Sequence, residues 1–172
     1  LNFVYKAFTT QDLKAAIGGI RALGIRGCAI SMPFKEACIE LLDQLDESAQ
    51  GIESVNTIVN TKGQLKGYNT DYQAVYQLLQ THEVPTSSSF MLRGSGGMAK
   101  SVLCALKNSG FKYGKLVARN EKTGRTLARQ YGYEWWPKHE GLAADNLINV
   151  TPLGMAGPPE ERELPFTHAQ IQ

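Results

Sequence analysis

This sequence has little of what marks a membrane protein or a nucleic-acid-binding protein. No apolar run approaches the roughly 20 residues that a membrane helix needs, so no membrane partner is expected. The net charge is only +2, and 18 Lys and Arg are scattered among 16 Asp and Glu, which argues against a nucleic-acid surface. With 42% hydrophobic residues, the 172-residue chain is predicted to be a soluble globular protein with a sizeable core.

Cysteine and histidine are scarce as well. The three cysteines lack metal-ligand spacing, and the three histidines stand alone in polar or loop-like stretches. These residues are Cys28, Cys38, Cys104, His82, His139 and His168. We therefore expect reduced thiols, no metal site and a cytoplasmic protein. The chain starts without methionine, on an expected strand at 3–5, so we also expect a fragment whose two domains are incomplete at their outer ends.

The first half of the chain alternates helices and strands. Its apolar residues recur first at helical spacing and then in short β-rich runs. The expected elements are helices over 13–23, from 33 and from 70, and strands over 25–32, 55–59 and 64–68, the last two joined by a hairpin turn over 60–63. Pro33 is suited to the first position of the second helix, and Asn69, Thr70 and Asp71 to the start of the third. The sequence predicts a first α/β domain over residues 1–80.

A linker and a second domain follow. Residues 81–89 are polar, contain a proline and show no periodicity, as is typical of linkers. Beyond them, the expected elements are strands over 90–93, 115–118, 133–136 and 147–150, with helices that end at 110 and span 123–131. Repeated βα units predict a parallel, doubly wound sheet of the Rossmann type over residues 90–172.

A glycine-rich turn joins the first of these strands to its helix. Gly94, Gly96 and Ala99 fit the dinucleotide fingerprint G-x-G-x-x-G/A. Gly94 would permit the tight turn, Gly96 the approach of a pyrophosphate, and Ala99 the close packing of helix on sheet. Such turns also arise for packing reasons, so the motif alone leaves nucleotide binding at about even odds.

The end of the next strand bears on which nucleotide is bound. An acidic residue there would bind the ribose hydroxyls of NAD, whereas Arg119 and Lys122 could hold the 2′-phosphate of NADP. By this rule NADP is favoured roughly three to one. Glu121 leaves room for NAD, and a solvated surface cation is the commoner reading of either basic residue alone. The loop Asn149–Met155 either reaches the nicotinamide end of the cofactor or is an ordinary turn, and its spacing does not choose.

Lys35 and Asp71 are the candidates for proton transfer. A secondary alcohol that gives hydride to a nicotinamide needs a group that handles its hydroxyl proton. Lys35 is expected in the first turn of the helix from 33, where the helix dipole disfavours its charge, and Asp71 at the start of another helix of the same domain. A surface lysine and an aspartate that stabilises its own helix would explain both residues without catalysis.

Five motifs in order give this pattern a family. They are Ser31-Met32-Pro33-Phe34-Lys35-Glu36, Val55-Asn56-Thr57-Ile58, Gly67-Tyr68-Asn69-Thr70-Asp71, Gly94-Ser95-Gly96-Gly97 and Ile148-Asn149-Val150-Thr151-Pro152-Leu153-Gly154-Met155. The series spans nearly the whole chain and resembles that of the shikimate dehydrogenase family.

The resemblance implies reversible, NADP-dependent reduction of 3-dehydroshikimate to shikimate, in the pathway to aromatic amino acids. It assigns a substrate domain to the first half and an NADP-binding Rossmann domain to the second. Lys35 and Asp71 are the implied catalytic pair, and Ser31 and Asn56 join Asp71 as substrate contacts. The implied cofactor contacts are Gly94, Ser95, Gly96, Gly97, Met98, Ala99, Arg119, Asn120, Lys122, Thr151 and Met155. The expected partner is a small cyclic polyol acid, and a homodimer is left open.

Some positions depart from the family pattern. Ala29 stands in place of a common asparagine, Ser31 of a threonine, Tyr72 of a glycine and Asn120 of a threonine. These changes resemble the shikimate-dehydrogenase-like side group of the family, whose substrate can differ. Two alternatives therefore stay open: a quinate or other cyclitol dehydrogenase that uses NAD or NADP, and a non-catalytic module that senses NADP.

Overall fold

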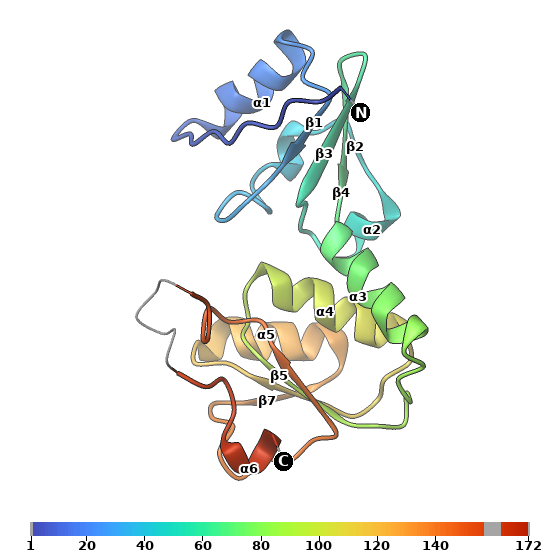
Figure 1. The fold of residues 1–172 in the computed structure, drawn as a ribbon, viewed down its shortest axis with the longest axis vertical. Helices are drawn as coiled ribbons and strands as arrows, with labels where there is room; N and C mark the ends of the chain where they lie inside the picture. Colours follow the sequence, from blue (N-terminus) through green and yellow to red (C-terminus); the bar gives the residue numbers. More distant parts are fainter. Residues whose placement is uncertain (1, 157–162, 172) are drawn as a thin grey trace. The chain divides into compact units, whose positions relative to one another are not determined.

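The computed structural model describes residues 2–156 and 163–171. The chain forms two compact α/β units, Leu1–Asn69 and Thr70–Gln172, and each is described by itself. Figure 1 shows the order of their helices and strands along the chain. The predicted α/β fold class, with a parallel sheet in the second half, is confirmed.

The first unit is built on a four-stranded mixed sheet with the order β1-β3-β4-β2. Its strands are β1 (Gly27–Ala29), β3 (Thr57–Thr61), β4 (Gln64–Tyr68) and β2 (Gln44–Leu45). β3 runs antiparallel to both β1 and β4, whereas β2 is parallel to β4. The predicted hairpin is confirmed, with Lys62 and Gly63 in left-handed conformations at φ 53° and 88°.

Helix α1 (Leu13–Ala22) packs on this sheet. The Asp12 side chain caps it by accepting a hydrogen bond from the backbone N–H of Ala15. Ile17 and Ile20 turn from the helix into a core that includes Ile58 and Leu65 of the hairpin. Two shorter elements, η1 (Ile39–Leu41) and α2 (Glu47–Gln50), complete the first unit and were not predicted.

Two strands expected in the first unit differ in the structure. Phe3, Val4 and Tyr5 form no strand, and their side chains are 74%, 96% and 84% exposed. A strand needs a hydrogen-bonded neighbour, and none of the described strands pairs with these residues. The strand expected over 25–32 is also shorter, because only 27–29 pair with β3.

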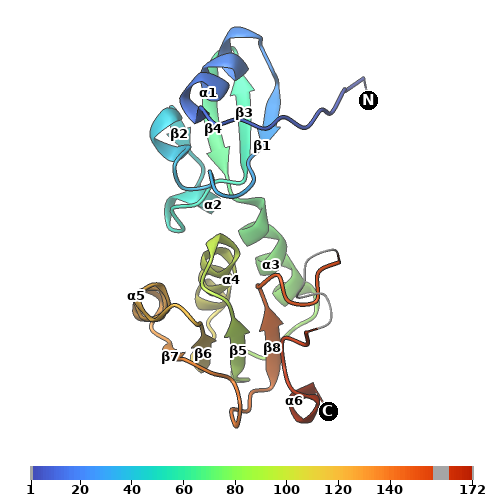
Figure 2. The ribbon, with the colours of Figure 1, turned by 90° about the vertical axis from the view of Figure 1, so that its left-hand side faces the viewer.

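The second unit holds a parallel sheet with the order β7-β6-β5-β8. Its strands are β5 (Phe90–Arg93), β6 (Gly114–Val117), β7 (Glu134–Trp136) and β8 (Asn146–Asn149). α4 (Gly97–Asn108) connects β5 to β6, and α5 (Glu121–Tyr131) connects β6 to β7 (Figure 2). Numbered along the chain, the strands stand in the order third, second, first, fourth, which is that of the Rossmann fold.

Alternate residues of β5 face two different cores. Phe90 and Leu92 pack with α4 and α5, whereas Met91 packs with Phe166 on the other face of the sheet. The segment around Phe166 ends in α6 (His168–Ile171). The guanidinium of Arg93 donates to the carbonyls of Leu164 and Pro165, which holds this segment against the end of β5.

The units divide after Asn69 rather than after residue 80. Helix α3 (Thr70–Thr81), expected to close the first domain, packs through Val75 and Leu79 against the core of the second unit. The expected linker is also part of the second unit, because the side-chain amide of Asn146 donates to Ser88 and Ser89. The polar composition of 81–89 therefore reflects a surface turn rather than a domain boundary.

Candidate functional site

The glycine-rich turn lies where β5 meets β8, at the carboxyl edge of the parallel sheet. Gly94 has φ +123°, a backbone conformation that residues other than glycine rarely adopt. A Cβ on Gly94 would stand 2.9 Å from Cγ2 of Val150 and 3.1 Å from Cγ2 of Thr151. The turn and the loop after β8, two predicted sites, are therefore in contact. They meet between the first and fourth strands, where the strand order reverses and doubly wound sheets bind their ligands.

The remaining turn residues lead into α4. Gly96 is the N-cap, with φ −86°, and a Cβ there would meet nothing within 4 Å. Glycine at this position therefore leaves the backbone open, as a cradle for a phosphate group requires. Gly97 and Met98 form the first turn of the 12-residue helix, whose free N–H groups favour an anion. Ala99 is fully buried, as close packing of helix on sheet predicts.

The predicted basic residues follow β6 at the same edge. Arg119 and Lys122 are exposed. Asn120 between them is the N-cap of α5, and its Oδ1 accepts from the backbone N–H of Thr123 at 3.1 Å. The hydroxyls of Thr123 and Ser95 lie 3.0 Å apart, so the glycine-rich turn is hydrogen-bonded to the start of α5. Sequence reasoning gave Thr123 no role.

A side-chain network shapes the loop after β8. Oδ1 of Asn149 accepts from the N–H and the hydroxyl of Thr151 at 3.0 and 2.7 Å, and its Nδ2 donates to the carbonyl of Leu153. Met155, at the end of the loop, is 59% exposed. Asn149 was not singled out as a site residue, although asparagine followed two residues later by threonine is a recognisable turn signal.

Lys35, in the first unit, lies in a series of turns and not in a helix, so the expected helix from Pro33 is wrong. The carbonyl of Lys35 accepts from the N–H of Val55 at 2.8 Å. The N–H of Ile39, which would donate to this carbonyl in an α-helix, donates to the carbonyl of Glu36. This diversion breaks the helical ladder, so the helix-dipole argument for Lys35 does not apply. Cys38 is fully buried, and its thiol contacts the Lys35 carbonyl at 3.6 Å. Burial raises the pKa of Cys38 to about 11, so the thiol keeps its proton and can donate.

Ser31 and Asn56, two of the three proposed substrate contacts, lie close together in the first unit. The N–H of Ile30, next to Ser31, donates to the carbonyl of Asn56 at 2.8 Å. Asn56 in turn donates through its N–H to Tyr68, and its side-chain oxygen accepts from Thr57. The backbone bonds from Val55 to Lys35 and from Asn56 to Tyr68 thus join three separate sequence motifs.

Asp71 belongs to the second unit, although we expected it in the same domain as Lys35. It is the second residue of α3 and follows Asn69, the last residue of the first unit. Asn69 is fully buried; its side chain donates to the carbonyl of Ser54 at 2.8 Å, and its N–H donates to the hydroxyl of Ser48. The first unit therefore anchors the chain two residues before Asp71.

Comparison with known proteins accounts for this combination of sites. The family model for the shikimate dehydrogenase substrate binding domain matches residues 1–58. A shikimate dehydrogenase-like protein of Haemophilus influenzae is 56% identical over 171 residues, which are 99% of this chain and 63% of that protein. The chain is thus similar to members of the shikimate dehydrogenase family. It spans less than two thirds of the length of this relative.

Solved members of the shikimate dehydrogenase family share the fold. A shikimate 5-dehydrogenase-like protein superposes with a TM-score of 0.91 at 56% identity, over 99% of this chain and 64% of that one. The Thermus thermophilus shikimate 5-dehydrogenase, solved with NADP(H) and shikimate, gives 0.73 at 28% identity, over 86% and 56%. A Corynebacterium glutamicum quinate dehydrogenase, solved with NAD, gives 0.75 at 28% identity, over 85% and 56%.

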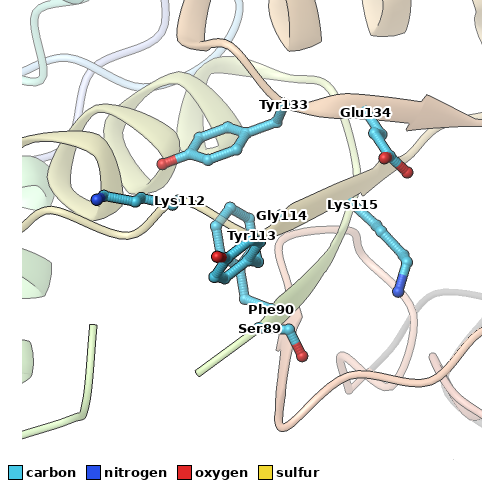
Figure 3. Close-up of a pocket in the computed structure, with 8 residues that line it drawn as sticks. All are labelled: Ser89, Phe90, Lys112, Tyr113, Gly114, Lys115, Tyr133 and Glu134. Atoms are coloured by element: carbon cyan, nitrogen blue, oxygen red, sulfur yellow. The ribbon is translucent and has the colours of Figure 1, made fainter. Parts of the chain in front are cut away.

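A pocket in the second unit lies away from the predicted dinucleotide site. It opens at the amino ends of β5, β6 and β7, beside Phe90, Gly114 and Glu134 (Figure 3). The rings of Phe90 and Tyr133 meet edge to face at 4.8 Å, and a Cβ on Gly114 would overlap Phe90. No predicted site residue lines the pocket, and we assign it to aromatic packing.

Two further findings on the described residues concern membrane-spanning helices and metal-binding clusters. No helix among them is both long and apolar enough to cross a membrane. They also contain no group of three or more His, Cys, Asp or Glu side chains arranged to hold a metal ion.

Proposed function

We propose that this chain forms the catalytic and dinucleotide-binding parts of an NADP-dependent dehydrogenase that interconverts shikimate and 3-dehydroshikimate, in aromatic amino-acid biosynthesis. One observation carries the proposal: Gly94 packs against Val150 and Thr151 at the point where the strand order reverses. That arrangement supports a dinucleotide site in a chain that also carries the Lys35 motif. Similarity to the shikimate dehydrogenase family suggests the substrate class.

The residues at the carboxyl edge suit a phosphorylated dinucleotide. The open backbone at Gly96 and the N–H groups of Gly97 and Met98 would bind the pyrophosphate. Arg119 and Lys122 would bind the 2′-phosphate. Thr151 and Met155 would border the nicotinamide, which accepts or supplies the hydride when the cofactor is bound.

The first unit would supply Ser31, Asn56 and Lys35, and the second unit Asp71, as the groups that handle the alcohol. Ser31 and Asn56 would hydrogen-bond ring hydroxyls of the substrate and so fix its orientation. Nζ of Lys35 would take the hydroxyl proton as the alcohol is oxidised and return it in the reverse direction, with Asp71 as its partner. The backbone bond from Val55 to Lys35 would hold this lysine near Asn56.

A second candidate, a quinate or other cyclitol dehydrogenase using NAD or NADP, is favoured by Ala29 and Ser31. Both are exposed, on either side of buried Ile30. A methyl group at position 29 offers no hydrogen bond to a substrate hydroxyl. One ring position is then read less strictly than in an enzyme with asparagine there.

The test measures reduction of NADP+ and NAD+ by the full-length protein with shikimate, quinate and related polyols. We expect shikimate with NADP+ to give the highest kcat/KM, whereas preference for another polyol would select the second candidate. Lys35→Met should lower kcat at least about 100-fold, because general acid–base groups typically contribute that much. Lys14→Met, which removes an exposed lysine from α1, is the matched control.

Two results would contradict the proposal, one for the role of Lys35 and one for catalysis itself. If Lys35→Met turns over substrate like the unaltered protein, Lys35 is not the proton-transfer group. If the protein binds NADP+ tightly in calorimetry but oxidises no polyol, it is a non-catalytic sensor.

A further inference from the structure

A hydrogen bond joins the two parts of the proposed dinucleotide site. Oγ of Ser95 and Oγ1 of Thr123 lie 3.0 Å apart, although 28 residues separate them in the chain. Ser95 stands in the glycine-rich turn after β5, and Thr123 in the first turn of α5 after β6. The bond therefore links the turns that follow two neighbouring parallel strands.

Each end of this bond is itself held in place. Ser95 follows Gly94, which packs against the loop after β8. Thr123 donates its N–H to Oδ1 of Asn120, and its hydroxyl lies 3.4 Å from the Asn120 carbonyl, so that hydroxyl can donate there while it accepts from Ser95. Asn120 directly follows Arg119. A displacement of Thr123 would thus carry the backbone next to Arg119 with it.

We propose that Thr123 is a positioning residue for cofactor choice: through Ser95 it fixes the segment Arg119–Lys122 relative to the glycine-rich turn. This inference rests on the proposed binding of NADP. The pyrophosphate and the 2′-phosphate belong to one molecule, so the groups that hold them must keep a fixed separation. NAD has no 2′-phosphate, so its binding does not depend on Arg119 and Lys122. The hydrogen bond therefore favours NADP selectively.

The primary test compares the Kd of NADP+ and NAD+, by calorimetry and without substrate, in variants of the full-length protein. Thr123→Val keeps the shape of the side chain and removes the hydroxyl. Loss of one hydrogen bond is expected to raise the Kd of NADP+ about three- to tenfold and that of NAD+ less than about twofold. Thr123→Ser keeps the hydroxyl and should retain the NADP preference. Thr126→Val is the matched control, because the Thr126 hydroxyl on the same helix bonds only to its own turn at the Lys122 carbonyl.

A double-variant cycle separates positioning from a merely structural role. In an Arg119→Gln, Lys122→Gln background, which lacks both cations proposed for the 2′-phosphate, Thr123→Val should change the Kd of NADP+ no more than that of NAD+. Equal weakening of NADP+ and NAD+ by Thr123→Val, or a lower melting temperature without a change in their Kd ratio, would overturn the inference. If the unaltered protein binds neither nucleotide, the proposed function itself fails, which is a different result from tight NADP+ binding that Thr123→Val does not alter.

Discussion

At the scale of single residues, Gly94 and Gly96 belong to one turn but meet different physical demands. Gly94 combines a positive φ with close contact to Val150 and Thr151. Gly96 has an ordinary φ and open space at its Cβ position. The first glycine is thus needed by the fold and the second by a ligand, and substitution separates the two roles.

Gly94→Ala should destabilise the second unit. A methyl group would be strained at φ +123° and would stand 2.9 Å from Val150, so we expect a loss of about 1–3 kcal/mol in the free energy of unfolding. Urea titration followed by tryptophan fluorescence measures it, because both tryptophans, Trp135 and Trp136, lie in the second unit. An unaltered urea midpoint would contradict the role assigned to Gly94.

Gly96→Ala should have the opposite profile. Its methyl group meets no protein atom, so stability should change by less than about 0.5 kcal/mol. The methyl would occupy the space proposed for the pyrophosphate, and crowding of this kind weakens binding by about 1–3 kcal/mol, or roughly five- to 150-fold in the Kd of NADP+. Calorimetry with NADP+ checks this. Binding as tight as in the unaltered protein would place the pyrophosphate elsewhere.

The sequence predicted which residues carry the glycine-rich turn but not the local structure around Lys35. Glycines at fixed spacing between a strand and a helix are a local signal, and the structure has that order of elements. The turns at Lys35 depend on a hydrogen bond from Val55, 20 positions later. A contact of that kind leaves no mark on the periodicity of the segment that it reshapes.

At the scale of elements, Asp43 joins α1 to β4 in the first unit. Its carboxylate accepts from the Arg21 guanidinium at 2.7 and 3.2 Å and from the N–H of Leu65 at 2.6 Å. Arg21, together with the Leu65 N–H, lowers the pKa of Asp43 below its ordinary value of 3.8. A carboxyl whose pKa is lowered by folding stabilises the folded state above its ordinary pKa, and this contribution is lost as the pH falls through the lowered value.

Asp43→Asn should therefore lower stability at neutral pH and matter less in acid. At pH 7 we expect the variant to unfold at lower urea than the unaltered protein, since the amide cannot pair with Arg21. The difference should shrink as the pH falls below the ordinary pKa of 3.8, where the unfolded chain takes up a proton at Asp43, and be lost below the lowered pKa, where the folded protein does so too. Circular dichroism at both pH values measures the midpoints. Glu40→Gln, which removes a charge from the same segment, is the control, and a difference independent of pH would contradict the linkage.

Elements with strong local signals were predicted well, and those that depend on partners were not. The hairpin and the helices of the second unit have turn residues, caps and apolar stripes of their own. The expected strand at Phe3 had only β-propensity and finds no partner among the described strands. β2, only two residues long, is too short to show periodicity and is defined by its pairing with β4.

At the scale of the whole molecule, the boundary between the units was predicted after residue 80 and lies after Asn69. The pattern of an amphipathic helix shows that one face is buried but not which core buries it. Val75 and Leu79 of α3 pack against the core of the second unit. The partner of α3 is α4, which lies later in the chain, and the polar stretch after α3 suggested a boundary in the wrong place. As a result, α3 carries Asp71 on the second unit, and Lys35 belongs to the first.

Paired substitutions on α3 test this division. Leu79 packs against the core of the second unit, whereas its neighbour Leu78 is 56% exposed. Leu79→Ala should cost about 1–2 kcal/mol of the unfolding free energy reported by tryptophan fluorescence, below the full cost for a buried leucine because the side chain is only partly buried. Leu78→Ala should change it by less than about 0.5 kcal/mol. Trp135 and Trp136 both lie in the second unit, so their fluorescence reports the unfolding of that unit. If Leu79→Ala leaves the urea midpoint of this transition unchanged, α3 belongs to the first domain and the boundary lies near residue 80.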